Sequence, residues 1–155
     1  MEIRDPIHGA IELTNAELQL LDSLPYQRLR AIKQLGFAEF SFPGATHNRY
    51  LHSIGVCHLA SCAFDLIFKD FEFSSTAARS RMRQCLRLAA LLHDIGHGPL
   101  SHTTEEVMPK LSELNVKAYK NRREDLNFVL IPESKEQRAN HEDYTIKFIT
   151  DSSLS

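Results

Sequence analysis

One stretch of the 155-residue sequence, residues 88–102, is dense in side chains that bind metals or transfer protons. It reads LAALLHDIGHGPLSH, and its leucines and isoleucine recur at the three- and four-residue spacing of a buried helix face. His93 and Asp94 stand on that face, where a structural helix would carry another aliphatic residue. An HD pair by itself is more often a core histidine bonded to its own aspartate. Four metal-ligating groups within ten residues favour an active site instead.

Imidazole and carboxylate together suit a divalent transition metal, namely Mn, Fe, Co, Ni or Zn, with Mg as a less suited alternative. His52 is a third candidate ligand, because it continues the expected buried stripe of a long helix one turn earlier. A lone histidine there is usually a hydrogen-bonded core residue, but the second histidine-rich helix favours a ligand. His52, His93 and Asp94, hereafter the metal triad, would leave coordination positions open for water or a phosphoryl oxygen.

Further polar residues surround these ligands in the sequence. His97, His102 and His141 are additional imidazoles, and at least one could be the general acid to a leaving oxygen, because histidine titrates near neutral pH. Glu105 lies one helical turn after His102 and could orient a histidine, although an ordinary surface carboxylate is an equal alternative. Two more residues are candidates for gripping substrate, with exposed polar side chains as the alternative: Gln34 and Arg49.

The elements that must position these side chains are mainly helical. Alternating isoleucines around two turn dipeptides predict a short hairpin or extended arm over residues 2–14. Apolar spacing and capping residues predict helices over residues 15–24, 25–35, 48–68, 76–93, 101–108 and 141–151. The expected caps are Thr14 or Asn15 for the first helix, Ser74, Ser75 or Thr76 for the fourth, and Asn140 for the last. We expect a loop or brief β-like excursion over residues 36–47, and short surface helices or a mobile lid over residues 110–139.

Several side-chain environments are also predicted from these patterns. The helix over 48–68 should bury four apolar residues: Val56, Leu59, Ala63 and Leu66. The helix over 25–35 has a polar face that is either solvated or anion-binding: Gln27, Arg28, Arg30 and Lys33. The next long helix carries arginines that solvation explains: Arg79, Arg81, Arg83 and Arg87. In the last helix we expect three residues to face inward: Tyr144, Phe148 and Ile149.

Length and composition suit one soluble domain. The chain is 43% hydrophobic and 25% charged, and its net charge of −2 gives no basic field, so nucleic-acid binding is not indicated. No uninterrupted apolar run approaches the roughly 20 residues that span a bilayer, so no membrane association is expected. The three cysteines, at positions 57, 62 and 85, are interpreted as buried thiols of a reducing cytoplasm.

Four sequence blocks resemble one known family: RDPIHGAIEL, YQRLRAIKQLG, FPGATHNRYLHSIGV and LLHDIGHGPLSH. They are similar to the HD-domain phosphohydrolases, in particular the branch of the SAM-and-HD-domain deoxynucleoside triphosphate triphosphohydrolase and its bacterial relatives. The resemblance runs from Asp5 to His141. It implies an all-α fold, one metal held through an H…HD…D pattern, and cleavage of deoxynucleoside triphosphates (dNTPs) to deoxynucleoside and triphosphate.

The resemblance also implies roles for individual residues. The metal ligands of the pattern match His52, His93 and Asp94. Residues that contact phosphates and assist the leaving group match His97, His102 and His141, and Glu105 falls where the best-known member has aspartate. Residues that contact the substrate match Gln34, Leu35 and Arg49. Residues that read a guanine nucleotide at an allosteric subunit interface match Asp22, Gln27 and Arg30, which implies a guanine-nucleotide activator and a homo-oligomer.

One feature departs from the family pattern. The last metal-binding aspartate of the family lies on a later helix, and only Asp143 and Asp151 follow the block that contains His141, both too early for that role. We therefore expect residues 1–155 to form a single HD domain without its C-terminal part. Two other functions stay open: an HD hydrolase of another nucleotide phosphoester, and a non-catalytic nucleotide-binding regulatory module.

Overall fold

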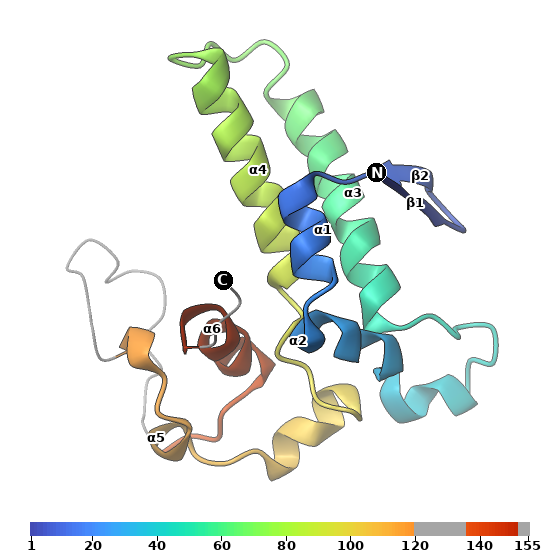
Figure 1. Ribbon diagram of the computed structural model, residues 1–155. Coiled ribbons are helices and arrows are strands. Elements are labelled where there is room, and N and C mark those ends of the chain that lie inside the picture. Colours follow the sequence, from blue (N-terminus) through green and yellow to red (C-terminus); the bar gives the residue numbers. More distant parts are fainter. Residues whose placement is uncertain (120–135, 152–155) are drawn as a thin grey trace.

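The computed structural model describes residues 1–119 and 136–151, and these form a mainly helical domain with one small hairpin (Figure 1). The strands are β1 (Glu2–Asp5) and β2 (Gly9–Glu12). The α-helices are α1 (Asn15–Leu21), α2 (Leu24–Gln27), α3 (Arg49–Ile67), α4 (Thr76–Leu92), α5 (Leu111–Leu114) and α6 (His141–Asp151). Short 3-10 helices complete the fold: η1 (Arg28–Ala31), η2 (Gly36–Phe40), η3 (Ser101–Val107) and η4 (Lys117–Tyr119). The all-α fold class and the N-terminal hairpin are confirmed.

The hairpin forms because its turn satisfies its own backbone. The Asp5 carboxylate accepts hydrogen bonds from the backbone N–H groups of Ile7 and His8, both at 2.8 Å. Gly9 then adopts a φ of +74°, a conformation that favours glycine. The strands pair antiparallel, and Ile11 is buried, so the hairpin is anchored to the main core.

The segment after the hairpin breaks into shorter helices than predicted. Thr14 and Glu17 form a capping box at the start of α1, which ends at Leu21 instead of residue 24. The helix predicted over residues 25–35 ends at residue 31, because Ile32 is extended and its carbonyl accepts the backbone N–H of Arg49 at 2.9 Å. Of the two alternatives predicted over residues 36–47, the loop is confirmed for residues 41–47, whereas residues 36–40 form η2 instead of a β-like segment. The residues that flank the segment share one isolated bridge.

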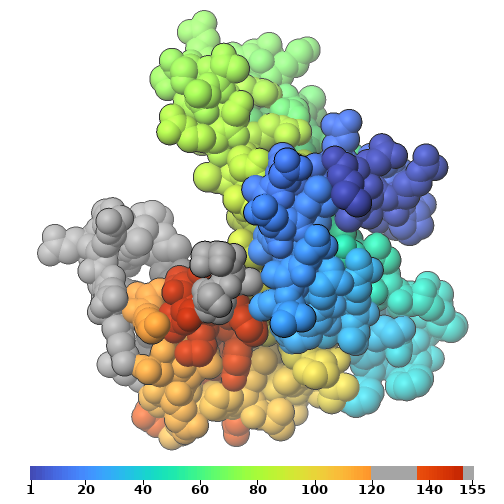
Figure 2. All heavy atoms as spheres, in the orientation of Figure 1, coloured from blue at the N-terminus to red at the C-terminus, as the bar shows by residue number. Residues whose placement is uncertain are grey.

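Helices α3 and α4 pack side by side as a long antiparallel pair, and the end of this pair projects beyond the rest of the domain (Figures 1 and 2). Asn48 caps α3, and Ser75, one of three residues predicted as possible caps, caps α4. The predicted buried face of α3 is wrong, because Leu59 and Leu66 are 54% and 75% exposed. The buried residues of α3 are instead Arg49, Tyr50, Ser53, Ile54, Gly55, Cys57, Ser61 and Phe64. Apolar residues lie nearly all round this helix, so their spacing did not select one face.

Two further environments differ from the predictions. Arg87 is buried, not solvated, and its Nε donates to Oε1 of the fully buried Glu17 at 2.6 Å, which ties α4 to α1. Arg79 and Arg83 instead pair with Asp65 on α3. Of the cysteines, only the one at position 57 is buried; those at 62 and 85 are exposed, so the prediction of three buried thiols is wrong.

Helix α3 contains no uninterrupted apolar run of the length that spans a bilayer. By length and composition alone, however, this 19-residue helix could cross a membrane, because its mean hydropathy is 1.3. The mean hydropathy stays high although α3 contains the polar residues Arg49, His52 and Asp65, which interrupt its apolar run. Because α3 packs against α4 and carries a buried, ion-paired arginine, it is the core helix of this fold.

The C-terminal part packs around a small second core. Leu111, Leu114, Val116 and Ala139 are buried together. Asn140 caps α6 as predicted, through its Oδ1 and the backbone N–H of Asp143 at 3.0 Å. Tyr144 and Phe148 of α6 are half-buried, but Ile149 is 45% exposed and the buried positions are Asp143 and Thr145. Short helices do occur at residues 111–119, and the rest of the predicted lid, residues 120–135, lies outside the described residues.

Candidate functional site

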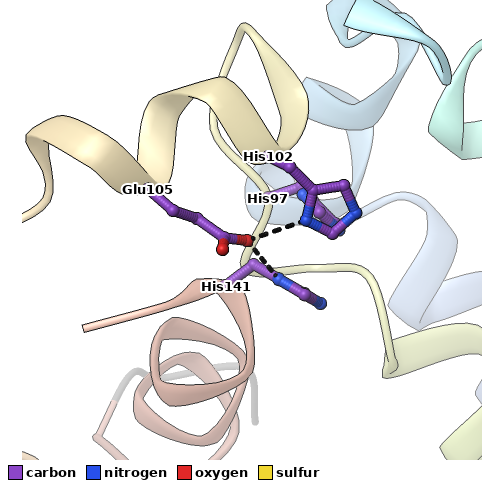
Figure 3. A group of neighbouring side chains, drawn as sticks. All are labelled: His97, His102, Glu105 and His141. Carbon is purple, nitrogen blue, oxygen red and sulfur yellow. Dashed lines mark hydrogen bonds and ion pairs between the residues drawn. The ribbon is translucent and has the colours of Figure 1, made fainter. Parts of the chain in front are cut away.

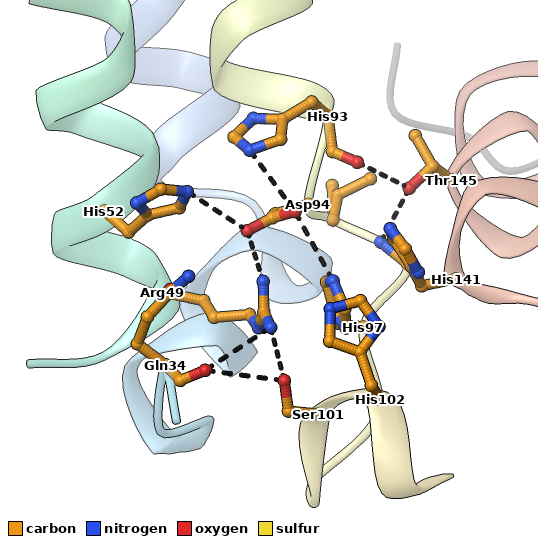
Figure 4. Close-up of polar contacts among 12 residues, drawn as sticks. Gln34, Arg49, His52, His93, Asp94, His97, Ser101, His102, His141 and Thr145 are labelled. Carbon is orange, nitrogen blue, oxygen red and sulfur yellow. Dashed lines mark hydrogen bonds and ion pairs between the residues drawn. The ribbon is translucent and has the colours of Figure 1, made fainter. Parts of the chain in front are cut away.

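The functional side chains gather around the turn that follows α4, residues 93–97. Arg28 holds this turn from one side: its Nη2 donates to the carbonyl of Ile95 and its Nη1 to that of His97, both at 2.6 Å. Thr145 holds it from α6, accepting the backbone N–H of Gly96 at 3.0 Å and donating to the carbonyl of His93 at 3.1 Å (Figure 4). The sequence did not predict that Arg28 or Thr145 lies at the site, although Arg28 belongs to the polar face predicted over residues 25–35.

Glycine is required in this turn because α6 lies directly on it. A Cβ on Gly96 would lie 2.0 Å from the carbonyl oxygen of His141 and 2.4 Å from the backbone nitrogen of Thr145. Gly98 is similarly tight, since its Cβ would lie 2.4 Å from a side-chain carbon of Thr104. The close approach at Gly96 brings the first residue of α6, His141, next to the turn.

The three residues of the metal triad converge, as the sequence predicted. Asp94 Oδ2 lies 3.6 Å from His52 Nε2, and Asp94 Oδ1 lies 3.3 Å from His93 Nε2 (Figure 4). The potential ligand atoms of the three side chains all lie within 4.8 Å of one another. Two imidazoles and one carboxylate at this spacing fit a divalent transition metal. His93 is exposed and His52 half-buried, so ligands from solvent can approach.

The electrostatics favour the metal-binding forms of these side chains. Burial alone would raise the pKa of Asp94, but the hydrogen bond from His97 and the charges of His93 and Arg49 outweigh it and lower this pKa. The carboxylate is therefore ionised at neutral pH. Burial lowers the pKa of His52, partly opposed by the charge of Asp94, which leaves a neutral imidazole with a free lone pair.

Arg49 and Gln34, the predicted substrate-gripping residues, lie beside the triad. The buried Arg49 donates from Nη1 to Asp94 Oδ2 at 2.6 Å and from Nη2 to Ser101 Oγ. Its Nη2 also lies 3.5 Å from the backbone carbonyl of Gln34, whose side-chain Oε1 is buried without a hydrogen-bond partner. Leu35 is 37% exposed at the edge of this group. Ser101, at a φ of +57°, is a site neighbour that sequence reasoning missed.

The remaining predicted catalytic residues form a second group (Figure 3). This group, hereafter the histidine cluster, consists of His97, His102, His141 and Glu105. The rings of His97 and His141 stack, with centroids 3.8 Å apart. Glu105 Oε1 lies 3.0 Å from His102 Nδ1 and 2.6 Å from His141 Nδ1. Burial would raise the pKa of Glu105, but the hydrogen bonds from His141 and His102 lower it. An ionised carboxylate thus orients two imidazoles.

One contact joins the histidine cluster to the metal triad. His97 Nε2 lies 3.4 Å from Asp94 Oδ1, and His97 is only 1% exposed. Burial lowers the pKa of His97, and the hydrogen bond to Asp94 opposes this shift only in part. A group of side chains that could hold a metal and a cluster of imidazoles are therefore in direct contact.

The residues predicted to read a guanine nucleotide are only partly together. Gln27 Oε1 accepts a hydrogen bond from Arg30 Nε at 2.8 Å, and the Arg30 guanidinium lies 3.7 Å from the centroid of the Tyr50 ring. Asp22 lies exposed at the end of α1, and within the described residues no side-chain hydrogen bond connects it to the other two. Gln27 and Arg30 thus present one polar, partly exposed surface.

A cavity lies against the triad on the side of the hairpin. It has a volume of about 440 Å³ and is lined by the hairpin turn, the loop before α3 and the first turns of α3, including His8, His47, His52 and Gly55. The hairpin turn therefore forms a wall next to one metal-ligand candidate.

Comparisons with known proteins show which family the chain is similar to. The family model of the HD domain matches residues 49–150. The human deoxynucleoside triphosphate triphosphohydrolase SAMHD1 is 45% identical over 100 residues, which are 64% of this chain and 16% of that protein. The SAMHD1 homolog of Dictyostelium discoideum is 42% identical over 110 residues, 70% of this chain and 21% of that protein.

A solved structure of a hypothetical protein from Aquifex aeolicus is also similar, with a TM-score of 0.62 and 32% identity. The match covers 99% of this chain and 31% of that one. The chain thus spans about a sixth to a fifth of the length of these curated relatives and a third of the solved one.

Proposed function

Because the chain belongs to the HD domain family, we propose that it carries part of the active site of a metal-dependent phosphohydrolase that converts dNTPs to deoxynucleoside and triphosphate. The observation that carries this proposal is the contact between Asp94 and His97, at 3.4 Å. It makes a metal position continuous with a group of oriented imidazoles. The names of relatives at 42–45% identity supply the substrate class.

The metal triad would hold the cation through two imidazoles and one carboxylate. A bound ion of this kind lowers the pKa of water and neutralises charge on a phosphate under attack. We further propose that a carboxylate from outside the described residues completes the coordination. Asp143 is a poor candidate, because it caps α6 and accepts the Tyr119 hydroxyl at 2.6 Å. Asp151 is also a poor candidate for this ligand, because it accepts a hydrogen bond from the backbone N–H of Lys117 at 3.2 Å.

The side chains of the chain itself supply phosphate binding and proton transfer. Arg49 and the unpartnered Gln34 amide oxygen can contact the substrate beside the triad. The Glu105 carboxylate accepts a hydrogen bond from Nδ1 of His102 and another from Nδ1 of His141. The Nε2 atom of each ring is then left to contact the substrate. In the reaction, water attacks the α-phosphorus and the bond to the 5′ oxygen breaks. An Nε2–H of the histidine cluster protonates that oxygen as the deoxynucleoside leaves.

The Gln27–Arg30 surface would bind a guanine nucleotide and support association of subunits. A guanidinium fixed against the Tyr50 ring and bonded to Gln27 can present paired hydrogen bonds to a base edge. Titration with GTP and dGTP, followed by light scattering, tests this. If neither nucleotide changes the particle size, and if Arg30→Ala binds both as well as wild type does, this surface is only a solvated polar face. A cytoplasmic location also stays a prediction.

The substrate is tested by product analysis of this chain on a dNTP panel with Mn²⁺ supplied. Deoxynucleoside and inorganic triphosphate are expected in equal amounts. Glu105→Gln should lower the rate by about 10- to 100-fold, because two histidines lose their orienting carboxylate. The exposed neighbour Glu106, changed to Gln, is the matched control.

Other outcomes of the same assay identify the alternative functions. Release of pyrophosphate or monophosphate would indicate a hydrolase of another phosphoester. Nucleotide binding without turnover would indicate a regulatory module.

A further inference from the structure

A pair of metal-ligating side chains lies one turn apart on α3, outside both the metal triad and the histidine cluster. Cys62 Sγ lies 3.7 Å from His58 Nε2, and the four-residue spacing places both side chains on one face of the helix. The triad and the histidine cluster contain neither residue and no cysteine. The proposed function therefore does not use this pair.

The distance within this pair is close to that of a coordination sphere. Zn²⁺ lies about 2.0–2.1 Å from an imidazole nitrogen and about 2.3 Å from a thiolate sulfur, so these two atoms of a tetrahedral site are roughly 3.5 to 3.6 Å apart. The 3.7 Å between His58 and Cys62 therefore needs almost no change to hold one ion. Because Cys62 is exposed, an ion reaches its sulfur from solvent and the thiol proton leaves to water.

The hairpin turn supplies a third imidazole. The rings of His8 and His58 lie beside each other, with centroids 5.2 Å apart and planes at 36°. Two imidazoles on one tetrahedral ion have centroids roughly 5.2 Å apart, because each centroid lies about 3.2 Å from the ion. The Cδ2–Nε2 edge of His8 lies 3.5 Å from the Cβ position of Gly55, and among the described residues no hydrogen bond fixes this ring. The ring is therefore free to turn about its Cβ–Cγ bond and present a nitrogen to the ion.

A carboxylate beside these imidazoles favours a cation. Burial would raise the pKa of Asp5 in the hairpin turn, but two backbone hydrogen bonds and the charges of His8 and His58 lower it. The carboxylate is therefore ionised at neutral pH. Because it interacts with both imidazoles, it offsets part of the charge of an ion that they bind.

We propose that His8, His58 and Cys62 form a site for a divalent cation of the Zn²⁺ class, with water as the fourth ligand. Two imidazoles and one thiolate favour Zn²⁺ or Co²⁺ over Mg²⁺. Because His8 belongs to the hairpin turn and the other two ligands to α3, the ion ties the hairpin to this helix. The same turn is a wall of the cavity beside His52, so the ion also fixes that wall. The site does not depend on the proposed function.

The thiolate distinguishes this site from the metal triad and the histidine cluster, because sulfur bound to Co²⁺ gives an intense near-ultraviolet charge-transfer band. Co²⁺ titrated into the wild-type chain, with its thiols kept reduced by a phosphine, should produce this band. Cys62→Ser should abolish it, and His58→Ala and His8→Ala should each raise the half-saturating Co²⁺ concentration by at least about 10-fold. The matched control Cys85→Ser, which removes the exposed thiol of α4, should keep the band. Circular dichroism verifies that each variant is folded.

Absence of the band from wild type, or its persistence in Cys62→Ser, would overturn the site. Unchanged half-saturation in His8→Ala would overturn the tie between the hairpin and α3. Hydrogen exchange measures that tie independently, at the amides of Ile7 and His8 that bond to the turn carboxylate. Zn²⁺ at about ten times its dissociation constant should slow their exchange about 10-fold in wild type but not in Cys62→Ser. Equal exchange rates in the two proteins would also overturn the tie.

Discussion

Replacing Gly96 by alanine should separate α6 from the turn that carries the metal triad. Gly96 has an ordinary backbone conformation, so alanine adds only its Cβ. That atom would lie 2.0 Å from the carbonyl oxygen of His141 and 2.4 Å from the backbone nitrogen of Thr145. Both obstacles are backbone atoms of the first turn of α6, so no side-chain rotation relieves the overlap.

The size of the effect follows from these distances. Ordinary contact begins near 3.4 Å, so the carbonyl of His141 must retreat by about 1.4 Å from its 2.0 Å position. Overpacking of this kind costs about 1–3 kcal/mol of stability. The retreat also carries the His141 ring away from Glu105 and His97. A misplacement of about 1 Å can lower a rate by roughly 100-fold.

Three measurements distinguish this mechanism from general unfolding. In urea denaturation, the free energy of unfolding of Gly96→Ala should be about 1–3 kcal/mol lower than that of wild type. Metal content should be retained, because none of the triad residues lies on α6. Hydrolysis of dNTPs should fall by about two orders of magnitude. Gly44→Ala is the matched control, since nothing lies within 4 Å of its Cβ position. Equal stability and equal hydrolysis in the two variants would refute the reasoning.

Three other substitutions test the metal triad, the buried ion pair and the contact that holds the turn. Asp94→Asn should lower metal affinity by at least about 10-fold, and unchanged metal by elemental analysis would exclude Asp94 as a ligand. Glu17→Gln should lower the free energy of unfolding at pH 7 by about 3–5 kcal/mol, because Arg87 stays buried without its partner. Burial raises the pKa of Glu17, but the hydrogen bond from Arg87 outweighs it and lowers this pKa in the folded state. The difference between wild type and variant should therefore shrink as the pH falls below 4.5, and a constant difference in urea titrations would contradict this. Arg28→Ala should cost about 1–3 kcal/mol by leaving two carbonyls without donors. The exposed Arg81→Ala should stay within about 0.5 kcal/mol, and equal urea midpoints for these two variants would count against the role of Arg28.

Predictions that depend on a few neighbouring residues agree well with the structure. Ser75 and Asn140 cap the helices for which they were expected to do so, because a cap bonds to a backbone group only three residues away. The hairpin likewise follows from a short local turn. The helix predicted over residues 25–35 failed at Ile32, where a hydrogen bond from the distant Arg49 replaced the local one.

The sequence by itself determined which residues could bind a metal, that His93 and Asp94 end a helix, and that the chain is mainly helical. Only the tertiary structure decided that the triad and the histidine cluster meet at Asp94 and His97, and which arginines are buried. The physical reason is separation along the chain: Arg87 bonds to Glu17 from 70 residues away, Arg28 to His97 from 69, and Thr145 to Gly96 from 49. A charged or hydroxyl side chain has the same local pattern whether it meets water or a buried partner. Its partner exists only once helices distant in sequence have packed together.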